Sequence, residues 1–413
     1  MSLLVLKFGG TSVGDIERIG NAAGKVEAEV RKGHKVAVVV SAMAGVTNQL
    51  IDYCRTIAPI HDPREHDAVV ATGEQVTAGL MALALQQKGL NARSWQGWQI
   101  PLRTDTAHGK ARIIDIDAAA FRKRIEDGEI GVMAGFQGIT DGDRITTLGR
   151  GGSDTSAVAL AGALKADRCD IYTDVDGVYT TDPRIVAKAR KLPRIGYEEM
   201  LEMASLGAKV LQTRAVEMGM HTRIPIQVLS TFADAVGSDL PGTLVTDEEE
   251  TMEQNIVTGI AYTRDEAKIT LAKVADRPGV AAAVFGPLAR AGVIVDMIVQ
   301  TASEDGQATD ITFTVSKSEL ERAKQVLESE RKAIGYGKLL AASDVAKISL
   351  VGAGMKSHAG VAARMFETLA EKKINIQVIE TSEINTSVLI AEEYTELALR
   401  ALHTAYGLDG KDE

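Results

Sequence analysis

Short apolar runs alternate with helical patterns over the first 245 residues of the chain. The runs are rich in valine and isoleucine, as in strands buried on both faces, and cover residues 3–8, 35–41, 130–135, 168–173 and 225–230. Apolar residues at helical spacing, several behind an Asp, Ser or Pro start signal, predict helices over residues 15–32, 63–88, 153–166 and 197–218. This alternation predicts an α/β fold in which helices sandwich a largely parallel sheet.

The rest of the chain contains an internal repeat. An acidic run at residues 247–250 is typical of a solvated linker. Beyond it, residues 268–271 match 347–350, and residues 278–282 match 359–363. Each copy predicts a ferredoxin-like βαββαβ unit. The domains expected from these patterns are residues 1–245, a linker over 246–263, and repeats over 264–340 and 341–413.

The repeats have two possible uses, which do not exclude each other. The glycine turn that opens the first helix of each copy exposes backbone N–H groups, which can bind the carboxylate of a small amino acid. The edge of each predicted sheet can also pair with another copy of the chain. The repeats therefore predict an amino-acid-binding module, a dimerisation module, or both.

Composition and charge narrow the class of protein. With 413 residues, 45% of them hydrophobic and 25% charged, the chain is long enough for two or three globular domains. The net charge of -10 argues against nucleic acid or an anionic membrane as a partner. Cys54 and Cys169 are too few for a disulfide framework and lack CxxC spacing, which suits a reducing cytoplasm and gives no support to structural zinc. Every apolar run is too short for a signal peptide or a membrane span.

Four loops carry glycines and polar side chains. Three of them, residues 7–14, 41–47 and 174–184, follow predicted strands, and the fourth, residues 148–154, leads into a predicted helix. The carboxyl ends of parallel strands meet at one sheet edge, where α/β proteins bind ligands. In the first loop the glycines permit close backbone approach, and Lys7 places a positive charge where phosphate oxygens could lie. Taken alone, that loop would equally suit a simple turn, but the second loop repeats the arrangement. In the loop 148–154, Arg150 can grip a carboxylate with two hydrogen bonds.

These loops, together with residues 71–74, resemble the motifs of the aspartokinase family, and the resemblance covers nearly the whole chain. It is closest to the short, monofunctional type. The resemblance implies the amino-acid kinase fold, largely a parallel sheet sandwiched by helices, followed by two ferredoxin-like ACT domains, which bind regulatory amino acids. It also implies transfer of the γ-phosphoryl group of MgATP to the side-chain carboxylate of L-aspartate, the first step towards lysine, threonine and methionine.

The resemblance assigns roles to individual residues. Lys7, Gly10 and Asp154 would be catalytic, and Thr47, Glu74, Arg150 and Ser153 would hold aspartate. The nucleotide would be bound by Lys7, Gly9, Gly10, Ser41, Thr173, Asp174, Tyr179, Asp182, Arg184 and Lys209. Arg150 suits the α-carboxylate and Glu74 the α-ammonium, which leaves the side-chain carboxylate of the substrate to attack. That carboxylate is already ionised at neutral pH, with an ordinary pKa of about 3.9, so no general base is needed. No dedicated metal site is predicted, and Mg²⁺ is expected with ATP.

For the repeats, the resemblance implies feedback by lysine, threonine or both. The expected effector residues are Asp276, Gly279, Val280, Gln300, Asn375, Ile376, Thr381 and Glu383. Two neighbouring positions depart from the family pattern: Thr301 stands where an asparagine is usual, and Glu380 where a serine is usual. Because an amide is lost and a negative charge is added, we expect these changes to weaken or retune inhibition.

Several alternatives stay open at this point. The phosphate loops alone would also suit a kinase acting on glutamate or acetylglutamate, or a non-catalytic amino-acid sensor that kept the fold. The ACT repeats predict a homo-oligomer. Met252 could be an internal start that yields a small regulatory subunit. Residues 61–67 contain His, Asp and Glu, but Asp62 followed by Pro63 is more typical of a helix start than of a metal site.

Overall fold

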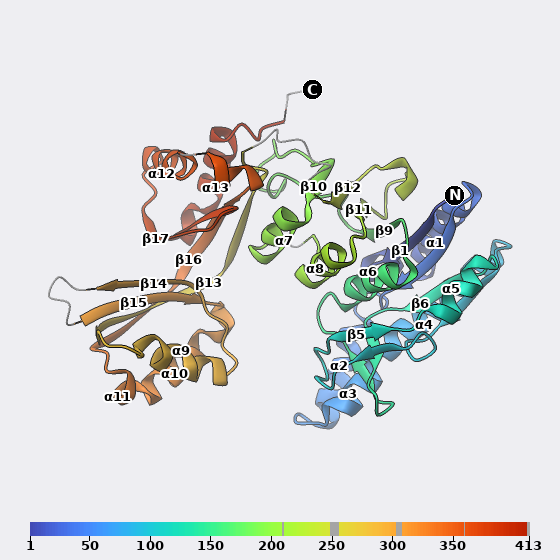
Figure 1. Ribbon diagram of the computed structural model, residues 1–413, viewed down its shortest axis with the longest axis horizontal. Coiled ribbons are helices and arrows are strands. Elements are labelled where there is room, and N and C mark those ends of the chain that lie inside the picture. Colours follow the sequence, from blue (N-terminus) through green and yellow to red (C-terminus); the bar gives the residue numbers. More distant parts are fainter. Residues whose placement is uncertain (209, 248–255, 303–307, 359, 411–413) are drawn as a thin grey trace. The chain divides into compact units, whose positions relative to one another are not determined.

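The computed structural model describes residues 1–208, 210–247, 256–302, 308–358 and 360–410 (Figure 1). The chain forms two compact units. The first comprises Met1–Val178, Lys191–Ser205 and Lys209–Met252, and the second comprises Tyr179–Arg190, Leu206–Ala208 and Glu253–Glu413. The short stretches that belong to the second unit interrupt the sequence of the first, so the division does not follow a single cut in the chain.

An eight-stranded sheet organises the first unit, in the order β10-β12-β11-β9-β1-β2-β6-β3. Its strands are β1 (Leu3–Phe8), β2 (Lys35–Val40), β3 (Ala92–Trp95), β6 (Ile130–Ala134), β9 (Arg168–Thr173), β10 (Arg194–Gly196), β11 (Ile226–Ser230) and β12 (Thr243–Thr246). Among these described strands, neighbours are parallel except for β11 and β12. The predicted parallel α/β fold is therefore confirmed.

A second, small sheet of the first unit was not predicted. It has the order β5-β4-β7-β8. Its strands are β4 (Leu102–Thr104), β5 (Ile113–Ile116), β7 (Gln137–Ile139) and β8 (Ile145–Thr147). Strands this short contain too few residues to show an alternating pattern in the sequence.

The helices of the first unit are α1 (Ile16–Arg31), α2 (Val46–Ile57), α3 (Pro63–Val70), α4 (Thr72–Gln87), α5 (Ala119–Glu126), α6 (Gly152–Leu164), α7 (Tyr197–Ser205) and α8 (Thr213–Thr222). Asp62 caps α3, with a proline in the first turn, as predicted. Two single helices predicted from the sequence are each two helices. The stretch 63–88 changes from α3 to α4 at Ala71, and the stretch 197–218 is divided into α7 and α8.

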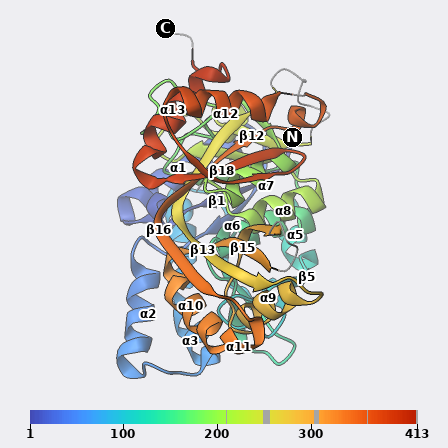
Figure 2. The ribbon, with the colours of Figure 1, turned by 90° about the vertical axis from the view of Figure 1, so that its left-hand side faces the viewer.

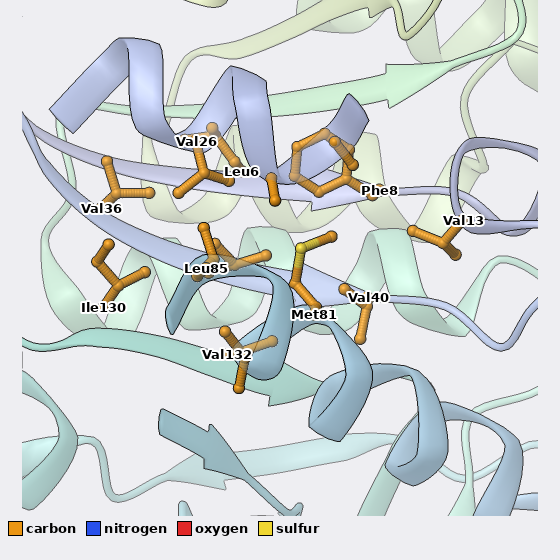
Figure 3. Close-up of a cluster of buried hydrophobic side chains, with 14 of the residues drawn as sticks. Leu6, Phe8, Val13, Val26, Val36, Val40, Met81, Leu85, Ile130 and Val132 are labelled. Atoms are coloured by element: carbon orange, nitrogen blue, oxygen red, sulfur yellow. The ribbon is translucent and has the colours of Figure 1, made fainter. Parts of the chain in front are cut away.

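The main core of this unit lies between the sheet and the pair α1 and α4. Figure 3 shows Leu6 and Phe8 of β1 facing Val26 of α1 and Met81 and Leu85 of α4. By length and composition alone, the helical stretch Pro63–Gln87 could cross a membrane, but half of its apolar window is buried, and Met81 and Leu85 are in the core. Because side chains alternate along a strand, Lys7 points to the opposite face of the sheet, where α6 packs.

The second unit is a six-stranded antiparallel sheet with helices, in the order β14-β15-β13-β16-β18-β17. Its strands are β13 (Gly259–Ala275), β14 (Asp296–Ala302), β15 (Ala308–Val315), β16 (Lys338–Val351), β17 (Ile376–Thr381) and β18 (Asn385–Ala391). Its helices are α9 (Val280–Arg290), α10 (Leu320–Ser329), α11 (Arg331–Ile334), α12 (Val361–Glu371) and α13 (Thr395–Ala405). The two predicted ferredoxin-like repeats are confirmed.

The repeats share their two longest strands, β13 and β16, which run side by side (Figure 2). The first five residues of β13, Gly259 to Thr263, pair with the last part of β16, Lys347 to Val351, and so serve the second repeat. The start of β16 pairs with the later part of β13 and so completes the first repeat. Each repeat keeps a separate core: α9 and α10 cover one, and α12 and α13 cover the other.

Candidate active site

The glycine loop that follows β1 lies between the ends of two neighbouring strands. After Phe8 the chain forms a short 3-10 turn, Gly10–Val13, and then α1, which Asp15 caps. The Gly9 amide donates to the carbonyl of Tyr172 in β9 at 3.2 Å. A side chain at Gly10 would place its first carbon 3.0 Å from the carbonyl oxygen of Ala42, in the loop after β2. Glycine therefore lets the first and second predicted loops touch.

Lys7 and Asp154 form an ion pair at this edge of the sheet. Lys7 comes from β1, and Asp154 comes from the first turn of α6. Their side chains are only 8% and 14% exposed, so solvent screens their attraction little. The structure thus brings together two of the residues that the sequence predicted to be catalytic.

Glu74 enters from the first turn of α4 and is 3% exposed. One carboxylate oxygen accepts a hydrogen bond from the Ala42 amide at 3.0 Å, and the other has no hydrogen-bond partner among the described residues. Burial raises the pKa of Glu74 to about 7, and the Ala42 hydrogen bond opposes that rise. A buried carboxylate with an unpaired oxygen is suited to accept hydrogen bonds from a cation.

The loop between β8 and α6 carries Arg150 on a backbone that only glycine adopts easily. Gly149 and Gly151 have positive φ angles of 78° and 69°. Arg150, between them, is exposed and makes no hydrogen bond or ion pair with the described part of the chain. Ser153, by contrast, is buried against Gly135 at the end of β6. The loop therefore presents a guanidinium group that can bind a ligand.

The remaining residues predicted for the first unit lie at the same strand ends. Ser41 follows β2, and its amide donates to the Phe8 carbonyl at 3.1 Å. Thr47 is half-buried in the first turn of α2. Thr173 ends β9, and its hydroxyl donates to the exposed Asp174 at 3.2 Å. Within the first unit, the loops after β1 and β2, the end of β9 and the starts of α4 and α6 thus lie close together.

Three residues predicted for nucleotide binding, Tyr179, Asp182 and Arg184, belong to the second unit. Asp182 accepts two hydrogen bonds from the Arg184 guanidinium, at 3.0 and 2.8 Å, and one from the Tyr262 hydroxyl at 3.2 Å. The hydrogen bond from the Arg184 side chain lowers the pKa of Asp182. Lys209, the last residue of the predicted set, lies outside the described residues.

The predicted effector residues occupy both repeats and are mostly exposed. Gly279 and Gly360 have positive φ angles of 89° and 96° and begin α9 and α12, as the predicted glycine turns require. Gln300 lies on β14 and Thr381 on β17, the two edge strands of the sheet. Asp276, Gly279, Gln300, Asn375, Thr381 and Glu383 are exposed, Ile376 is half-buried and Val280 is buried.

Sequence reasoning missed the residues that support the Arg150 loop from beneath. The sequence placed Asp67 in a run interpreted as a helix start rather than a metal site, and Arg214 only within the predicted helix over residues 197–218. Nothing in the local sequence signals them, because their partners lie far away along the chain and most are backbone groups.

Comparison with known proteins supports the resemblance read from the loops and repeats. Residues 2–230 match the amino acid kinase family, and residues 268–332 and 348–406 each match the ACT domain. An aspartate kinase of Stutzerimonas stutzeri is 55% identical over 410 residues, which are 99% of this chain and 98% of that protein. Escherichia coli aspartokinase III in complex with aspartate and ADP superposes with a TM-score of 0.80 at 27% identity, over 98% of this chain and 99% of that one. The same enzyme with lysine and aspartate gives a TM-score of 0.74 at 28% identity, again over 98% and 99% of the two chains.

Proposed function

The chain belongs to the aspartate kinase family, and from this premise we propose that it transfers the γ-phosphoryl group of ATP to the side-chain carboxylate of L-aspartate. The product is 4-phospho-L-aspartate. The observation that carries the proposal is the pair of unmatched charges at the strand ends: a buried Glu74 with one unpaired oxygen and an exposed Arg150. An amino acid offers one ammonium and one carboxylate to such a pair.

At the phosphate end, we propose that Lys7, Gly9, Gly10 and Ser41 face the transferring group. Lys7 would neutralise phosphate oxygens, and Asp154 would orient the Lys7 ammonium through their ion pair. The described residues include no group of three or more His, Cys, Asp or Glu side chains able to hold a metal by themselves. Mg²⁺ suits such a site because it commonly binds substrate phosphates with one or two carboxylates. When bound, it would neutralise negative charge on the phosphates.

At the aspartate end, Glu74 would accept hydrogen bonds from the α-ammonium, and Arg150 would grip the α-carboxylate with two hydrogen bonds. Ser153 and Thr47 would add hydroxyl contacts. With both α groups fixed, the side-chain carboxylate is the one left to reach the phosphate. Positioning two anionic reactants in line is then the main task of the site, since the attacking carboxylate needs no base.

The nucleotide would be held by Thr173, Asp174, Tyr179, Asp182 and Arg184, with Lys209 as a further ligand. Asp182 is held rigid by Arg184 and Tyr262, so it could accept hydrogen bonds from ribose hydroxyls without rearranging. The complex of aspartokinase III with aspartate and ADP supports a site for both substrates in this family.

We propose further that lysine, threonine or both regulate the enzyme through the ACT repeats, that it forms a homo-oligomer through them, and that it acts in the cytoplasm. The complex of aspartokinase III with lysine supports an effector site in the family. Met252, the candidate internal start of a small regulatory subunit, lies outside the described residues.

One assay tests the activity against its alternatives. The purified chain is incubated with MgATP and with aspartate, glutamate or acetylglutamate, and hydroxylamine traps the acyl phosphate as a coloured hydroxamate. We expect product with aspartate only. Preference for glutamate or acetylglutamate would make the chain a different amino-acid kinase, and no hydroxamate with any substrate would favour the amino-acid sensor.

A further inference from the structure

Asp67 of α3 is a buried carboxylate that holds two separate loops in place. One covers residues 105–112, and the other covers residues 147–154 and carries Arg150. The side chain is completely buried. One oxygen accepts hydrogen bonds from His108 Nδ1 at 2.8 Å, from the Gly109 amide at 3.0 Å and from the Thr147 amide at 3.0 Å. The other accepts from the Thr147 hydroxyl at 2.7 Å. Four donors offset the cost of burying this charge, and each forms a charge-assisted hydrogen bond with the carboxylate.

Arg214 of α8 joins the same two loops from another side. Its guanidinium donates to the carbonyl oxygen of Leu148 at 2.6 Å and to that of Ala111 at 2.9 Å. Two different nitrogens of the planar guanidinium each reach one carbonyl, a geometry that the single nitrogen of a lysine would not reproduce at this position. Arg214 binds no side chain in these contacts. Its two bonds fix main chain only.

The two loops also contact each other directly. The Ala111 amide donates to the Thr147 carbonyl at 3.0 Å. A side chain at Gly149 would come 3.0 Å from the Gly109 carbonyl oxygen, which shows how closely the backbones approach. Thr147 and Leu148 are therefore held by Asp67 and Arg214, and Gly149 lies close against the backbone of Gly109. The next residue is Arg150.

We propose that Asp67 and Arg214 are positioning residues that set the affinity for aspartate by fixing the main chain from Thr147 to Gly149. Neither touches the substrate. They act by holding the Arg150 guanidinium where it can form two hydrogen bonds at once with a carboxylate, because a displaced guanidinium keeps its charge but loses that geometry. The inference rests on the proposed role of Arg150 in aspartate binding.

The test measures the Michaelis constants of the full chain for aspartate and for ATP separately. Arg214→Met removes both hydrogen bonds to the loops and keeps a long, unbranched side chain at this position of α8. We expect the constant for aspartate to rise about tenfold and that for ATP to stay within about twofold. Asp67→Ala should shift the constant for aspartate in the same direction and further. The matched control is Arg144→Met, which breaks an exposed ion pair with Glu65 instead, and should change neither constant.

A double variant separates positioning from general loosening of the fold. In a background of Arg150→Ala, which itself raises the constant for aspartate, adding Arg214→Met should raise it no further, because both act on one interaction. Equal rises in both constants, full additivity with Arg150→Ala, or unchanged aspartate affinity in folded Arg214→Met and Asp67→Ala would overturn the inference. If the unmodified chain phosphorylates aspartate normally in the same experiment, the proposed function survives that result. If it does not, the proposed function fails first and this inference with it.

Discussion

The two regions expected to bind small molecules differ in how completely the chain builds them. At the strand ends of the first unit, Lys7, Asp154 and Glu74 are buried or nearly so, and each has a partner on another element. In the repeats of the second unit, most of the expected effector residues are exposed, Gln300 and Thr381 on opposite edge strands among them.

The difference follows from the functions expected of the two regions, catalysis in the first unit and regulation in the repeats. Stabilising a developing charge requires groups that are already fixed and screened from water, and burial within one chain supplies both. A regulatory site must instead distinguish two states of the protein, so it gains from groups that become ordered only when an effector or a second copy covers them. The comparison predicts large catalytic effects from changes at the strand ends and smaller, effector-dependent effects from changes in the repeats.

The largest effect is expected from Lys7→Ala. This change removes the positive charge proposed to neutralise the transferring phosphate, so turnover in the hydroxamate assay should fall at least about a thousandfold. The fold should persist, because the neighbouring core of β1 is apolar and unchanged. Circular dichroism and thermal unfolding would check this.

Lys32→Ala is the matched control, since it also breaks a lysine–aspartate pair, Lys32 with Asp239 at 2.6 Å, but at 38% and 52% side-chain exposure. Turnover should be unchanged, and stability should change by no more than about 0.5 kcal/mol. Near-normal turnover of folded Lys7→Ala would contradict its catalytic role and remove the contrast between the regions.

The second-largest effect is expected in the pH dependence of the Michaelis constant for aspartate. It arises from Glu74, whose pKa is raised to about 7 by burial. The ammonium of aspartate binds the ionised carboxylate better than the protonated one. The Michaelis constant for aspartate should therefore fall about tenfold as pH rises from about 6 to about 8, while that for ATP changes less.

Glu74→Gln provides the control, because it cannot ionise. Its constant for aspartate should be higher and nearly flat over the same pH range. The sign for stability is opposite: without substrate, Glu74 stabilises the fold fully below its ordinary pKa of 4.5, and this contribution is lost as pH rises through about 7. A constant for aspartate that rises with pH would show that Glu74 does not bind the ammonium.

A third prediction concerns the segment 179–190. This segment carries expected nucleotide ligands but belongs to the second unit, so the division into a catalytic first unit and a regulatory second unit is not complete. The Thr180 hydroxyl contacts His403 Nε2 of α13 at 2.8 Å, and His403 Nδ1 donates to Asp409 at 2.8 Å. Burial lowers the pKa of His403, which favours the neutral ring with its proton on Nδ1. Val186 of the same segment lies in the core of the second repeat.

His403→Ala should therefore loosen the segment that carries Tyr179 and Asp182. We expect the Michaelis constant for ATP to rise about fivefold while that for aspartate stays within about twofold. His221→Ala is the control, because His221 is exposed and its ring bonds the Glu217 carbonyl of its own helix. If ATP affinity is unchanged in a folded His403→Ala protein, the segment does not depend on the repeat for its position.

The helices and strands differ in how well the sequence predicts them. Alternation of apolar runs and helical patterns predicted the strands β1, β2, β6, β9 and β11 of the main sheet, because buried parallel strands are apolar throughout. The strands β3, β10 and β12 were missed because each is only three or four residues long. The division of 63–88 at Ala71 was missed, since alanine gives no break signal. The sharing of β13 and β16 between repeats was missed because pairing over such distances depends on tertiary structure, which local patterns do not encode.

The candidate site shows the same limit. Lys7, Glu74 and Arg150 could be singled out because each lies in a glycine-containing segment that resembles a motif of the aspartokinase family. Asp67 and Arg214 could not, because they act on backbone groups far away in the sequence. Residues in glycine loops and motifs leave a signal in the sequence, whereas residues that contact those loops through distant backbone groups are visible only in the fold.

The smallest effect is expected in the repeats, at the two positions that depart from the family pattern. Thr301 and Glu380 are exposed and lie on β14 and β17, each next to an expected effector residue. A zwitterionic effector brings a carboxylate, which a negative charge at position 380 would repel, and an amide lost at position 301 removes a donor and an acceptor. We therefore expect lysine, threonine and their mixture to inhibit initial rates weakly.

Restoring the family residues tests this reasoning directly. Thr301→Asn and Glu380→Ser should each lower the effector concentration for half-inhibition about threefold, with rates in the absence of effector unchanged. Glu371→Ser, an exposed change at the end of α12, is the matched control and should leave inhibition as it was. Strong concerted inhibition of the unmodified chain at low effector concentration would refute the hypothesis. It would also mean that one chain already builds its regulatory site as completely as its catalytic one.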